Sequence, residues 1–411
     1  MAAKGSQPAM RPVAFDKSLS GPLAGLRIVD LTRVVAGNMT SVQLADFGAD
    51  VIKIEPPGGD PLREWREAGS SLFWKVYGRN KRSIVIDVRA ESGLDTLRRL
   101  IASADVLIEN FRPGTLEAMG LSPDVLLGQN PRLVILRISG FGQTGPYAKR
   151  PGFGTLIEAM SGFASRTGFA DREPVLPPFA LADMVAGLQG AMAVMIALYA
   201  RDLRGGAGQV IDLSLLEGLF STLGPQAAEH RLTNRARERV GSASASSAPR
   251  NIYQCRDGGY CALSGATQAM AARIFAVIGR PELAVDPRFA TNQERVRNRE
   301  ALDAEIGAWF ATRTRDEAME AMREADVTVG PVYDVADAVT DPHFLDRILV
   351  DVPDPELGTV PMHAITPQMS GTPGQWRRPA PAPGEHTDDI LQEIGLGADA
   401  IAELRRSGSV R

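Results

Sequence analysis

Short apolar segments alternate with helical stretches through the first third of the chain. The apolar segments have the length of buried β-strands and occupy residues 26–31, 51–54, 84–88, 106–108 and 133–138. Helical segments, such as residues 92–103, separate them. Strands that alternate with helices form parallel sheets, because every strand must be reached by a crossover from the other end of the sheet. The sequence therefore predicts an α/β fold.

The length of 411 residues exceeds what one hydrophobic core usually serves, so we predict a large domain and a smaller one. Between them, the run of Ser and Ala at 241–247 has little to bury and is typical of a mobile loop. The predicted parts are a flexible leader (1–22), a large α/β domain (23–228), a linker and mobile loop (229–250), a small domain (251–326), and a return to the large domain with a C-terminal helix (327–411).

The small domain and the chain's return carry distinct local signals. A hairpin is expected around Asp257, and Thr314 with Glu317 forms a candidate capping box. A helix over residues 300–310 places four large apolar side chains on one face: Leu302, Ile306, Trp309 and Phe310. We expect the alternation of strand and helix to resume at 327–333, with a hairpin near 353–357 and a last helix at 388–394.

Composition excludes several classes of protein. A formal net charge of −4 argues against a nucleic-acid partner, which needs a basic face. The N-terminus lacks the apolar core of a signal peptide, and the apolar run 186–200 is too short and too interrupted to span a bilayer, so no membrane association is expected. Cys255 and Cys261 show no disulfide or metal spacing and are interpreted as reduced thiols of a cytoplasmic protein.

Familiar catalytic motifs are missing or out of context. Gly140-Phe-Gly-Gln-Thr-Gly145 matches a dinucleotide fingerprint, but Pro146 follows it where a helix should begin. The four histidines have no ligand spacing, and neither a G-x-S-x-G elbow nor a Walker A loop occurs. Chemistry in this chain must therefore depend on carboxylates, backbone amides, Arg and Lys, and we predict no metal.

Leu181-Ala-Asp183 places a lone acid at the start of a long apolar helix. Asp is a favoured helix cap, and taken alone this structural interpretation is the more frequent one. The functional interpretation is that the helix dipole keeps the carboxylate ionised in apolar surroundings and so able to attack a thioester. The spacing by itself does not decide between the two.

An ordered series of motifs around Asp183 resembles the class III CoA-transferases, the group that contains formyl-CoA transferase, carnitine CoA-transferase and α-methylacyl-CoA racemase. The motifs are Gly25-Leu-Arg-Ile-Val-Asp-Leu31, Leu44-Ala-Asp-Phe-Gly-Ala-Asp-Val-Ile-Lys-Ile-Glu55, Asn80-Lys-Arg-Ser83, Glu109-Asn-Phe-Arg-Pro-Gly114, Gly140-Phe-Gly-Gln-Thr-Gly-Pro146, Leu181-Ala-Asp183 and Gly384-Glu-His-Thr-Asp-Asp389. The resemblance implies a Rossmann-like large domain built from both chain ends, an inserted small α+β domain, and an interlocked homodimer.

The resemblance also implies a set of site residues. Asp183 falls at the family's catalytic aspartate, and Gly241, Ser242 and Ser244 fall on its substrate loop. The implied CoA contacts are Val35, Ala36, Asp87, Val88, Arg89, Asn110, Phe111, Arg112, Arg150 and Phe153. Lys81 and Arg82 are further candidates for the CoA phosphates, although an ordinary solvated charged edge is the alternative for them.

Departures from the family pattern narrow the expected chemistry. The racemase carries a His-Asp pair after the glycine numbered 152 here, where this chain has Phe153-Gly154. Racemisation needs two acid-base groups about the α-carbon, so transfer is favoured. Val35 in place of the glutamine of formyl-CoA transferase argues against formyl or oxalate substrates. Residues 150–156 and 177–181 look like those of members that use dicarboxylates and succinyl-CoA.

The resulting prediction is an acyl-CoA:carboxylate CoA-transferase. In the mechanism that the resemblance implies, Asp183 forms an acyl anhydride and then an aspartyl-CoA thioester, with no cofactor beyond CoA itself as substrate. Two other classes stay open: an α-methylacyl-CoA isomerase of the racemase type, and a non-catalytic acyl-CoA-binding protein.

Overall fold

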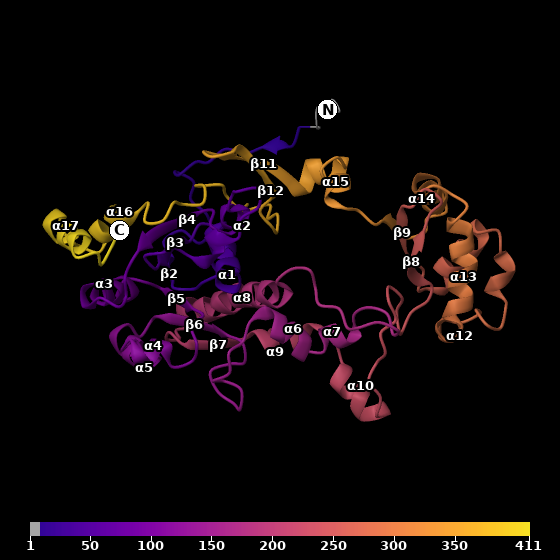
Figure 1. Cartoon of the computed structure of the whole chain (residues 1–411), viewed down its shortest axis with the longest axis horizontal. Coiled ribbons are helices and arrows are strands. Elements are labelled where there is room, and N and C mark those ends of the chain that lie inside the picture. Colours follow the sequence, from indigo (N-terminus) through magenta and orange to yellow (C-terminus); the bar gives the residue numbers. More distant parts are fainter. Residues whose placement is uncertain (1–8) are drawn as a thin grey trace. The chain divides into compact units, whose positions relative to one another are not determined.

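A computed structural model describes residues 9–411, which divide into two compact units (Figure 1). Unit 1 contains the chain up to Gly162, together with Pro177–Gly224 and Pro342–Arg411. Unit 2 contains Phe163–Leu176 and Pro225–Asp341. The chain thus leaves unit 1 twice and returns to it twice.

Unit 1 is built on a six-stranded parallel sheet with the order β4-β3-β2-β5-β6-β7. Its strands are β2 (Arg27–Asp30), β3 (Asp50–Glu55), β4 (Lys81–Val85), β5 (Val106–Glu109), β6 (Val134–Ser139) and β7 (Val210–Ser214). Successive strands extend first to one side of β2 and then, from β5 on, to the other. The order therefore reverses between β2 and β5, and α/β folds bind their ligands at the carboxyl ends of the strands where such a reversal occurs.

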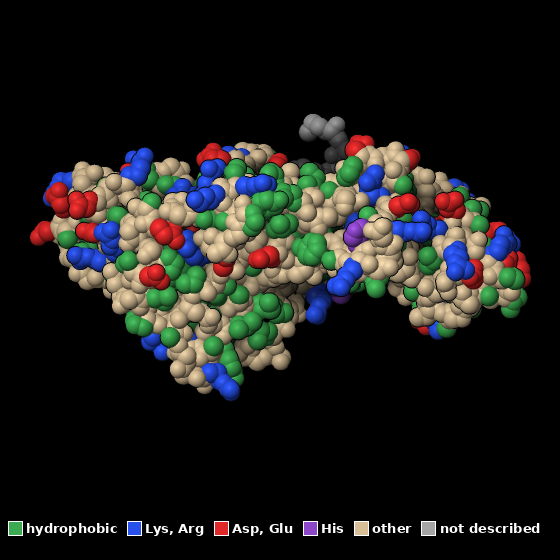
Figure 2. Space-filling view, turned by 90° about the horizontal axis from the view of Figure 1, so that it is seen from below, with side chains coloured by type: hydrophobic (Ala, Val, Ile, Leu, Met, Phe, Trp, Pro, Cys, Tyr) green, Lys and Arg blue, Asp and Glu red, His purple; other side chains and the backbone are tan. Residues whose placement is uncertain are grey.

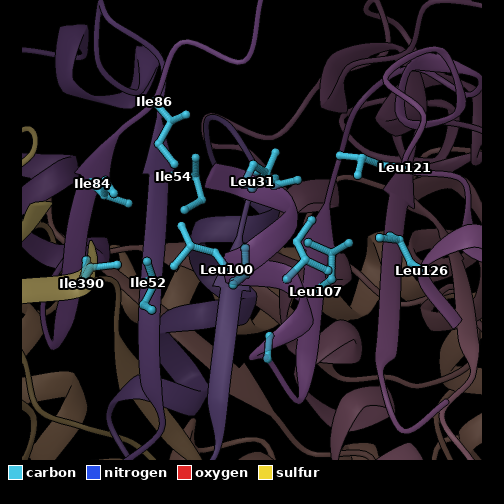
Figure 3. Packing of buried hydrophobic residues seen from close by; sticks show 14 of the residues in the cluster. Leu31, Ile52, Ile54, Ile84, Ile86, Leu100, Leu107, Leu121, Leu126 and Ile390 are labelled. Atoms are coloured by element: carbon cyan, nitrogen blue, oxygen red, sulfur yellow. The ribbon is translucent and has the colours of Figure 1, made fainter. Parts of the chain in front are cut away.

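Helices cover both faces of this sheet. On one face α1 (Ala36–Ala45) packs against α8 (Leu181–Leu203), and α8 contacts β6, β7, α6 (Gly154–Met160) and α9 (Leu215–Thr222). The other face carries α3 (Glu91–Ala102), α4 (Thr115–Ala118), α5 (Pro123–Gln129), α16 (Thr387–Glu393) and α17 (Ala398–Arg406). Figure 3 shows the core there, in which Ile52, Ile84 and Leu107 of the sheet meet Leu100 of α3 and Ile390 of α16.

The predicted parallel α/β arrangement is confirmed, with one shifted strand. Residues 84–88 were expected as a strand, whereas β4 begins three residues earlier, at Lys81. The shift buries Lys81 and Arg82 in the sheet. The predicted helices at 92–103 and 388–394 are confirmed as α3 and α16.

The remaining elements of unit 1 lie beside this sheet. They are β1 (Arg11–Pro12), η1 (Pro61–Glu64), α2 (Leu72–Tyr77), η3 (Phe344–Ile348), β11 (Leu349–Asp354) and β12 (Gly358–His363). The hairpin expected near 353–357 is confirmed, since β11 and β12 pair there. The leader differs from the expectation, because β1 pairs in parallel with β11. Residues 1–8 of that predicted leader lie outside the described residues.

Unit 2 has its own sheet and its own core. The antiparallel order is β10-β9-β8, with β8 (Arg250–Gln254), β9 (Tyr260–Ser264) and β10 (Val329–Pro331). Its helices are α7 (Phe163–Arg166), α10 (Gln226–Thr233), α11 (Gln268–Val277), η2 (Pro281–Ala284), α12 (Asn292–Arg297), α13 (Arg299–Phe310), α14 (Arg315–Glu324) and α15 (Val335–Ala338). Residues 327–333 were expected in the returning part of the large domain, whereas β10 pairs with β9.

Three local predictions for unit 2 are confirmed. The apolar face of α13 is buried in the core of the unit through Leu302, Ile306, Trp309 and Phe310. Thr314 and Glu317 form the capping box of α14, each side chain accepting the other residue's backbone N–H. The hairpin around Asp257 joins β8 to β9.

Helix α8 is longer than its sequence suggested. By length and composition alone it would be long enough to cross a membrane. In this fold it packs against α1 and the sheet, and its buried residues include Ala186, Gly190 and Val194. A Cβ at Gly187 would come within 2.6 Å of Met39, so the small residue lets the two helices approach closely.

Candidate active site

The loop that follows β2 lies where the strand order reverses, the switch point of the sheet. A side chain from the loop after β5 holds it in place. The backbone N–H of Arg33 donates to Oδ1 of Asn110 at 2.9 Å, and Nδ2 of Asn110 donates to the carbonyl of Arg33 at 2.8 Å. Val34 then adopts a left-handed φ of 64° before α1 begins at Ala36. Asn110, expected as a CoA contact, thus uses its amide to hold this loop.

Asp183 lies in the first turn of α8 and faces this loop. The residue at the helix cap is Ala180, so the capping interpretation of Asp183 is wrong. The backbone N–H of Ala36 donates to the Asp183 carboxylate. On another side the carboxylate lies against Gly154, where a Cβ would come within 2.4 Å of Oδ2. Only glycine at 154 leaves room for the carboxylate in this position.

Burial raises the pKa of Asp183 to about 6, and the nearby Glu158 carboxylate adds to that rise. The backbone N–H groups of Ala36 and of Asp183 itself lower it. The helix dipole was expected to keep this carboxylate ionised in apolar surroundings; the N–H of Asp183 at the start of α8 does lower its pKa, although burial has the larger effect. A carboxyl group with this pKa is still mostly ionised at neutral pH.

Glu158 is a site residue that the sequence analysis missed. Its side chain is buried at 3% exposure, and Oε1 accepts the backbone N–H of Ala182 at 3.2 Å. Gly154 and Glu158 are four residues apart in α6, so they lie on the same face of that helix. The one available signal was Gly154, at the position where the racemase has an acid.

The residues expected to bind CoA follow four strands of the parallel sheet. Val35 and Ala36 come after β2, residues 87–89 after β4, residues 110–112 after β5, and Arg150 with Phe153 after β6. Because parallel strands all end at one edge, these loops share the carboxyl edge of the sheet. Val35 and Ala36 are buried, so they offer this edge their backbone groups.

The side chains in the outer loops differ in what they contact. Val88 and Phe111 pack against the hydrophobic core, while Arg112 is exposed. Arg89 is 81% exposed and pairs with Asp87 at 2.8 Å. Arg150 lies over the ring of Tyr147 at 3.7 Å, and Phe153 is 70% exposed. Arg89, Arg112 and Arg150 are therefore cations at the surface of this edge.

The expectation that Lys81 and Arg82 face the CoA phosphates is wrong. Lys81 is fully buried, with Nζ donating to Oδ1 of Asn38 at 2.9 Å, and burial lowers its pKa to about 7. Arg82 is bound on both sides by carboxylates, those of Asp50 and Glu393, each at 2.6 Å. Both side chains therefore bind groups within unit 1.

The predicted substrate loop belongs to unit 2 and is held by backbone contacts. Gly241 has a φ of 62° and donates its N–H to the carbonyl of Gly168 at 2.9 Å, while the hydroxyls of Ser244 and Ser246 lie 3.3 Å apart. The carbonyl of Ser242 accepts a hydrogen bond from Arg250 at 3.3 Å.

Two sequence features that were set aside can be placed in the structure. From the end of β6 to Phe153 the chain forms turns, and α6 starts only at Gly154, so the glycine-rich segment 140–145 does not open a helix. The helix N-terminus that a dinucleotide fingerprint requires is therefore missing directly after this segment. Within residues 9–411 no three His, Cys, Asp or Glu side chains are grouped so as to hold a metal.

An α/β sheet with a carboxylate set against backbone donors at its switch point is suited to acyl transfer through a covalent carboxylate. The chain belongs to CoA-transferase family III, whose sequence profile matches residues 23–387. The predicted family and activity class are thereby confirmed, and the protein is a class III CoA-transferase that acts on CoA thioesters.

Similar proteins agree on this class. The chain is 41% identical over 93% of its length to succinyl-CoA–D-citramalate CoA-transferase of Chloroflexus aurantiacus, covering 97% of that protein. It is 35% identical over 91% of its length to succinate–glutarate CoA-transferase of Agrobacterium fabrum, covering 96% of it. A CAIB/BAIF family protein from Brucella suis shares the fold, with a TM-score of 0.81, 36% identity, and coverage of 92% of this chain and all of that one.

Proposed function

We propose that this enzyme moves CoA from succinyl-CoA to a second dicarboxylic acid, with Asp183 as the covalent carrier. The observation that carries the proposal is the Asp183 carboxylate, half-buried against Gly154 and hydrogen-bonded by Ala36 N–H. The choice of acids is supported by relatives named for succinyl-CoA with D-citramalate, L-malate or glutarate.

Each half of the reaction exchanges one bond for another. Asp183 attacks the donor's thioester carbonyl, the C–S bond breaks, and an acyl-aspartyl anhydride and CoA thiolate result. The thiolate then attacks Cγ of Asp183 and expels the donor acid as a carboxylate, which leaves an aspartyl-CoA thioester. The acceptor carboxylate attacks that thioester, which releases CoA thiolate and forms an anhydride between Asp183 and the acceptor. The thiolate then attacks the acceptor's carbonyl carbon in this anhydride, and the acceptor leaves as its CoA thioester. Asp183 is regenerated as a carboxylate, and no proton is consumed.

The environment of Asp183 suits these steps. A carboxylate with a pKa of about 6 is more basic than an exposed one and still ionised at neutral pH. Placing it near the like-charged Glu158 favours its conversion to a neutral anhydride or thioester. The N–H of Ala36 can donate to the oxygen that becomes negative at each attack.

We further propose that CoA lies along the carboxyl edge of the sheet. Backbone groups of Val35 and Ala36 would face its thioester end, while Arg89, Arg112 and Arg150 would meet its phosphates. Support comes from the exposure of these cations and from their shared edge. Asp87, Val88, Asn110, Phe111 and Phe153 would complete the wall. We also propose that Gly241, Ser242 and Ser244 form a loop that contacts the substrate.

We propose a homodimer as well, interlocked as in the family resemblance. Its support is a stripe of exposed apolar side chains along the free face of α8: Leu188, Met192, Met195, Ile196, Tyr199 and Leu203. Leu156 and Met160 are exposed apolar side chains of α6, which packs against α8. Monomers rarely leave so much apolar surface in water, and Figure 2 shows hydrophobic patches among charged side chains on the face it presents.

The free thiols of Cys255 and Cys261 fit a cytoplasmic enzyme.

The test is to incubate the enzyme with succinyl-CoA, add hydroxylamine, and analyse its peptides by mass spectrometry. We expect a hydroxamate on the peptide that contains Asp183, and we expect Asp183→Ala to lose both the label and turnover. Asp202→Ala, at the far end of the same helix, is the matched control and should keep both. An unlabelled peptide during active turnover would refute the covalent route.

The same preparation separates the alternatives. An isomerase would exchange an α-proton of an acyl-CoA for deuterium without a second acid present. A binding protein would retain CoA affinity and show no exchange of acids at all.

A further inference from the structure

Asp60 lies outside the residues assigned so far, yet it holds the loop that faces Asp183. It immediately precedes η1 and is 2% exposed. Its Oδ1 accepts the backbone N–H of Leu62 at 2.9 Å and that of Val34 at 3.1 Å. Its Oδ2 accepts Nδ2 of Asn38 in α1 at 2.9 Å. One carboxylate therefore joins η1, the loop and α1.

A buried lysine fixes this carboxylate in turn. Nζ of Lys53, on β3, lies 3.0 Å from Oδ2 of Asp60 and 3.2 Å from Oδ1 of Asp30. It also donates to the carbonyl of Thr32 at 2.5 Å. All of these polar side chains are buried. The loop is thus attached at Thr32 through Lys53 and at Val34 through Asp60.

The loop needs such attachments because of its backbone. Val34 has a φ of 64°, a region that β-branched residues rarely adopt. Asn110 binds the backbone of Arg33 on one side, and Asp60 binds the N–H of Val34 on the other. Two residues later, the N–H of Ala36 meets the Asp183 carboxylate. A rotation at Val34 would redirect that donor.

We infer that Asp60 is a positioning residue for CoA transfer. It holds Val34 in the left-handed conformation and thereby aims the N–H of Ala36 at the carboxylate of Asp183. Asp60 itself touches neither substrate, because its oxygens are occupied by Val34, Leu62, Asn38 and Lys53. The inference rests on the proposed role of Asp183 as nucleophile.

The experiment compares Asp60→Ala with Asp46→Ala. Asp46 is an equally buried acid of unit 1 and pairs with Arg79 at 2.6 Å, away from the loop. In Asp60→Ala we expect kcat to fall about 100-fold, as for a reacting group displaced by an ångström. We also expect the acidic limb of kcat/KM to move to higher pH, because a donor that lowers the pKa of Asp183 is lost. Asp46→Ala should leave that limb in place.

A second substitution tests the backbone directly. Glycine adopts positive φ without strain, so Val34→Gly added to Asp60→Ala should restore about 10-fold of the lost kcat if the loop's conformation is what matters. Glu158 also faces Asp183 and affects its pKa. Adding Glu158→Gln to Asp60→Ala tests whether the acidic limb of kcat/KM in that variant still reports the ionisation of Asp183. If Asp60→Ala does not fold, Asp60→Asn keeps an acceptor for Val34 and should show a smaller change of the same kind.

The outcomes are separable. Unchanged kcat and an unchanged limb in Asp60→Ala would overturn the inference, as would equal losses in Asp60→Ala and Asp46→Ala with no movement of the limb. Hydroxylamine trapping on the wild type decides the proposed function independently. A trapped Asp183 with an indifferent Asp60 would reject only the positioning role, whereas an untrapped Asp183 would reject the mechanism beneath it.

Discussion

The start of α8 and the segment before η1 each bury a carboxylate in unit 1, and the two carboxylates behave in opposite ways. Burial raises the pKa of Asp183 to about 6, and its charged neighbour, Glu158, acts in the same direction. Burial also acts to raise the pKa of Asp60, but Lys53 and three hydrogen-bond donors overcome it and lower that pKa to about 2. Burial acts in the same direction on both carboxylates, so the difference between their pKa values comes from their neighbours: Lys53 and the donors lower that of Asp60, and Glu158 adds to that of Asp183.

This difference gives the two acids opposite effects on stability. Asp60 has a lowered pKa, so it stabilises the fold above pH 4, and that contribution is lost as the pH falls through about 2. Asp183 has a raised pKa, so it destabilises the fold increasingly as the pH rises from about 4 through 6. The enzyme keeps Asp183 charged at neutral pH at a cost in stability, as expected where function needs a desolvated group.

Removing the cation should have the largest effect. Lys53→Met leaves the carboxylates of Asp30 and Asp60 buried without their partner, so we expect a loss of about 3 to 5 kcal/mol in the free energy of unfolding at pH 7. The measurement is urea denaturation followed by circular dichroism. Because Asp60 would then resemble Asp183, the variant should also be more stable at pH 5 than at pH 8.

The control for Lys53→Met is Arg98→Met, which breaks the surface pair with Asp95 on α3. That change should be close to neutral, because solvent screens exposed pairs. If Lys53→Met lowers the free energy of unfolding as little as Arg98→Met does, the buried pair with Lys53 does not explain why the pKa of Asp60 differs from that of Asp183.

Neutralising the nucleophile should have an intermediate effect of the opposite sign. Asp183→Asn removes an ionisable group whose pKa is raised to about 6, so we expect a gain of about 2 to 3 kcal/mol at pH 8 and little gain at pH 4. Thermal unfolding at the two pH values measures it. Turnover should be lost in the same variant, and a variant that is less stable at pH 8 would contradict the assigned environment.

Sequence reasoning succeeded where local patterns determine structure. The strand-length runs predicted most of the parallel sheet, and the spacing of Leu302, Ile306 and Trp309 predicted the buried face of α13. It failed where distant partners decide. Lys81 and Arg82 have the composition of a solvated edge, and they are buried only because Asn38, Asp50 and Glu393 meet them. No local signal contains those contacts.

The candidate site divides in the same way. Asp183 was found through an ordered series of motifs, whereas Glu158 and Asp60 were missed. Glu158 reaches the site across 24 residues through Ala182, and Asp60 reaches it across 26 residues through Val34. Helix packing and sheet order create these contacts, so they appear only when the fold is known.

Removing the like charge should have the smallest effect. Glu158→Gln keeps an oxygen that can accept the N–H of Ala182 and eliminates the repulsion of Asp183. We expect the acidic limb of kcat/KM to move down from pH 6 by about one unit. It should stay above the ordinary value of 3.8, because burial remains the larger cause. A pH profile with succinyl-CoA as donor measures the shift.

Glu91→Gln, the same chemical change in the exposed first turn of α3, is the control and should leave the limb where it is. If Glu158→Gln also leaves the acidic limb of kcat/KM unmoved, burial alone raises the pKa of Asp183. The difference between Asp183 and Asp60 would then come from Lys53 and not from Glu158. If the limb moves down as expected while kcat also falls, the like charge does more than tune acidity. The Glu158 charge would then also favour the neutral anhydride and thioester of Asp183 over its carboxylate. A cation such as Lys53 would instead stabilise the carboxylate.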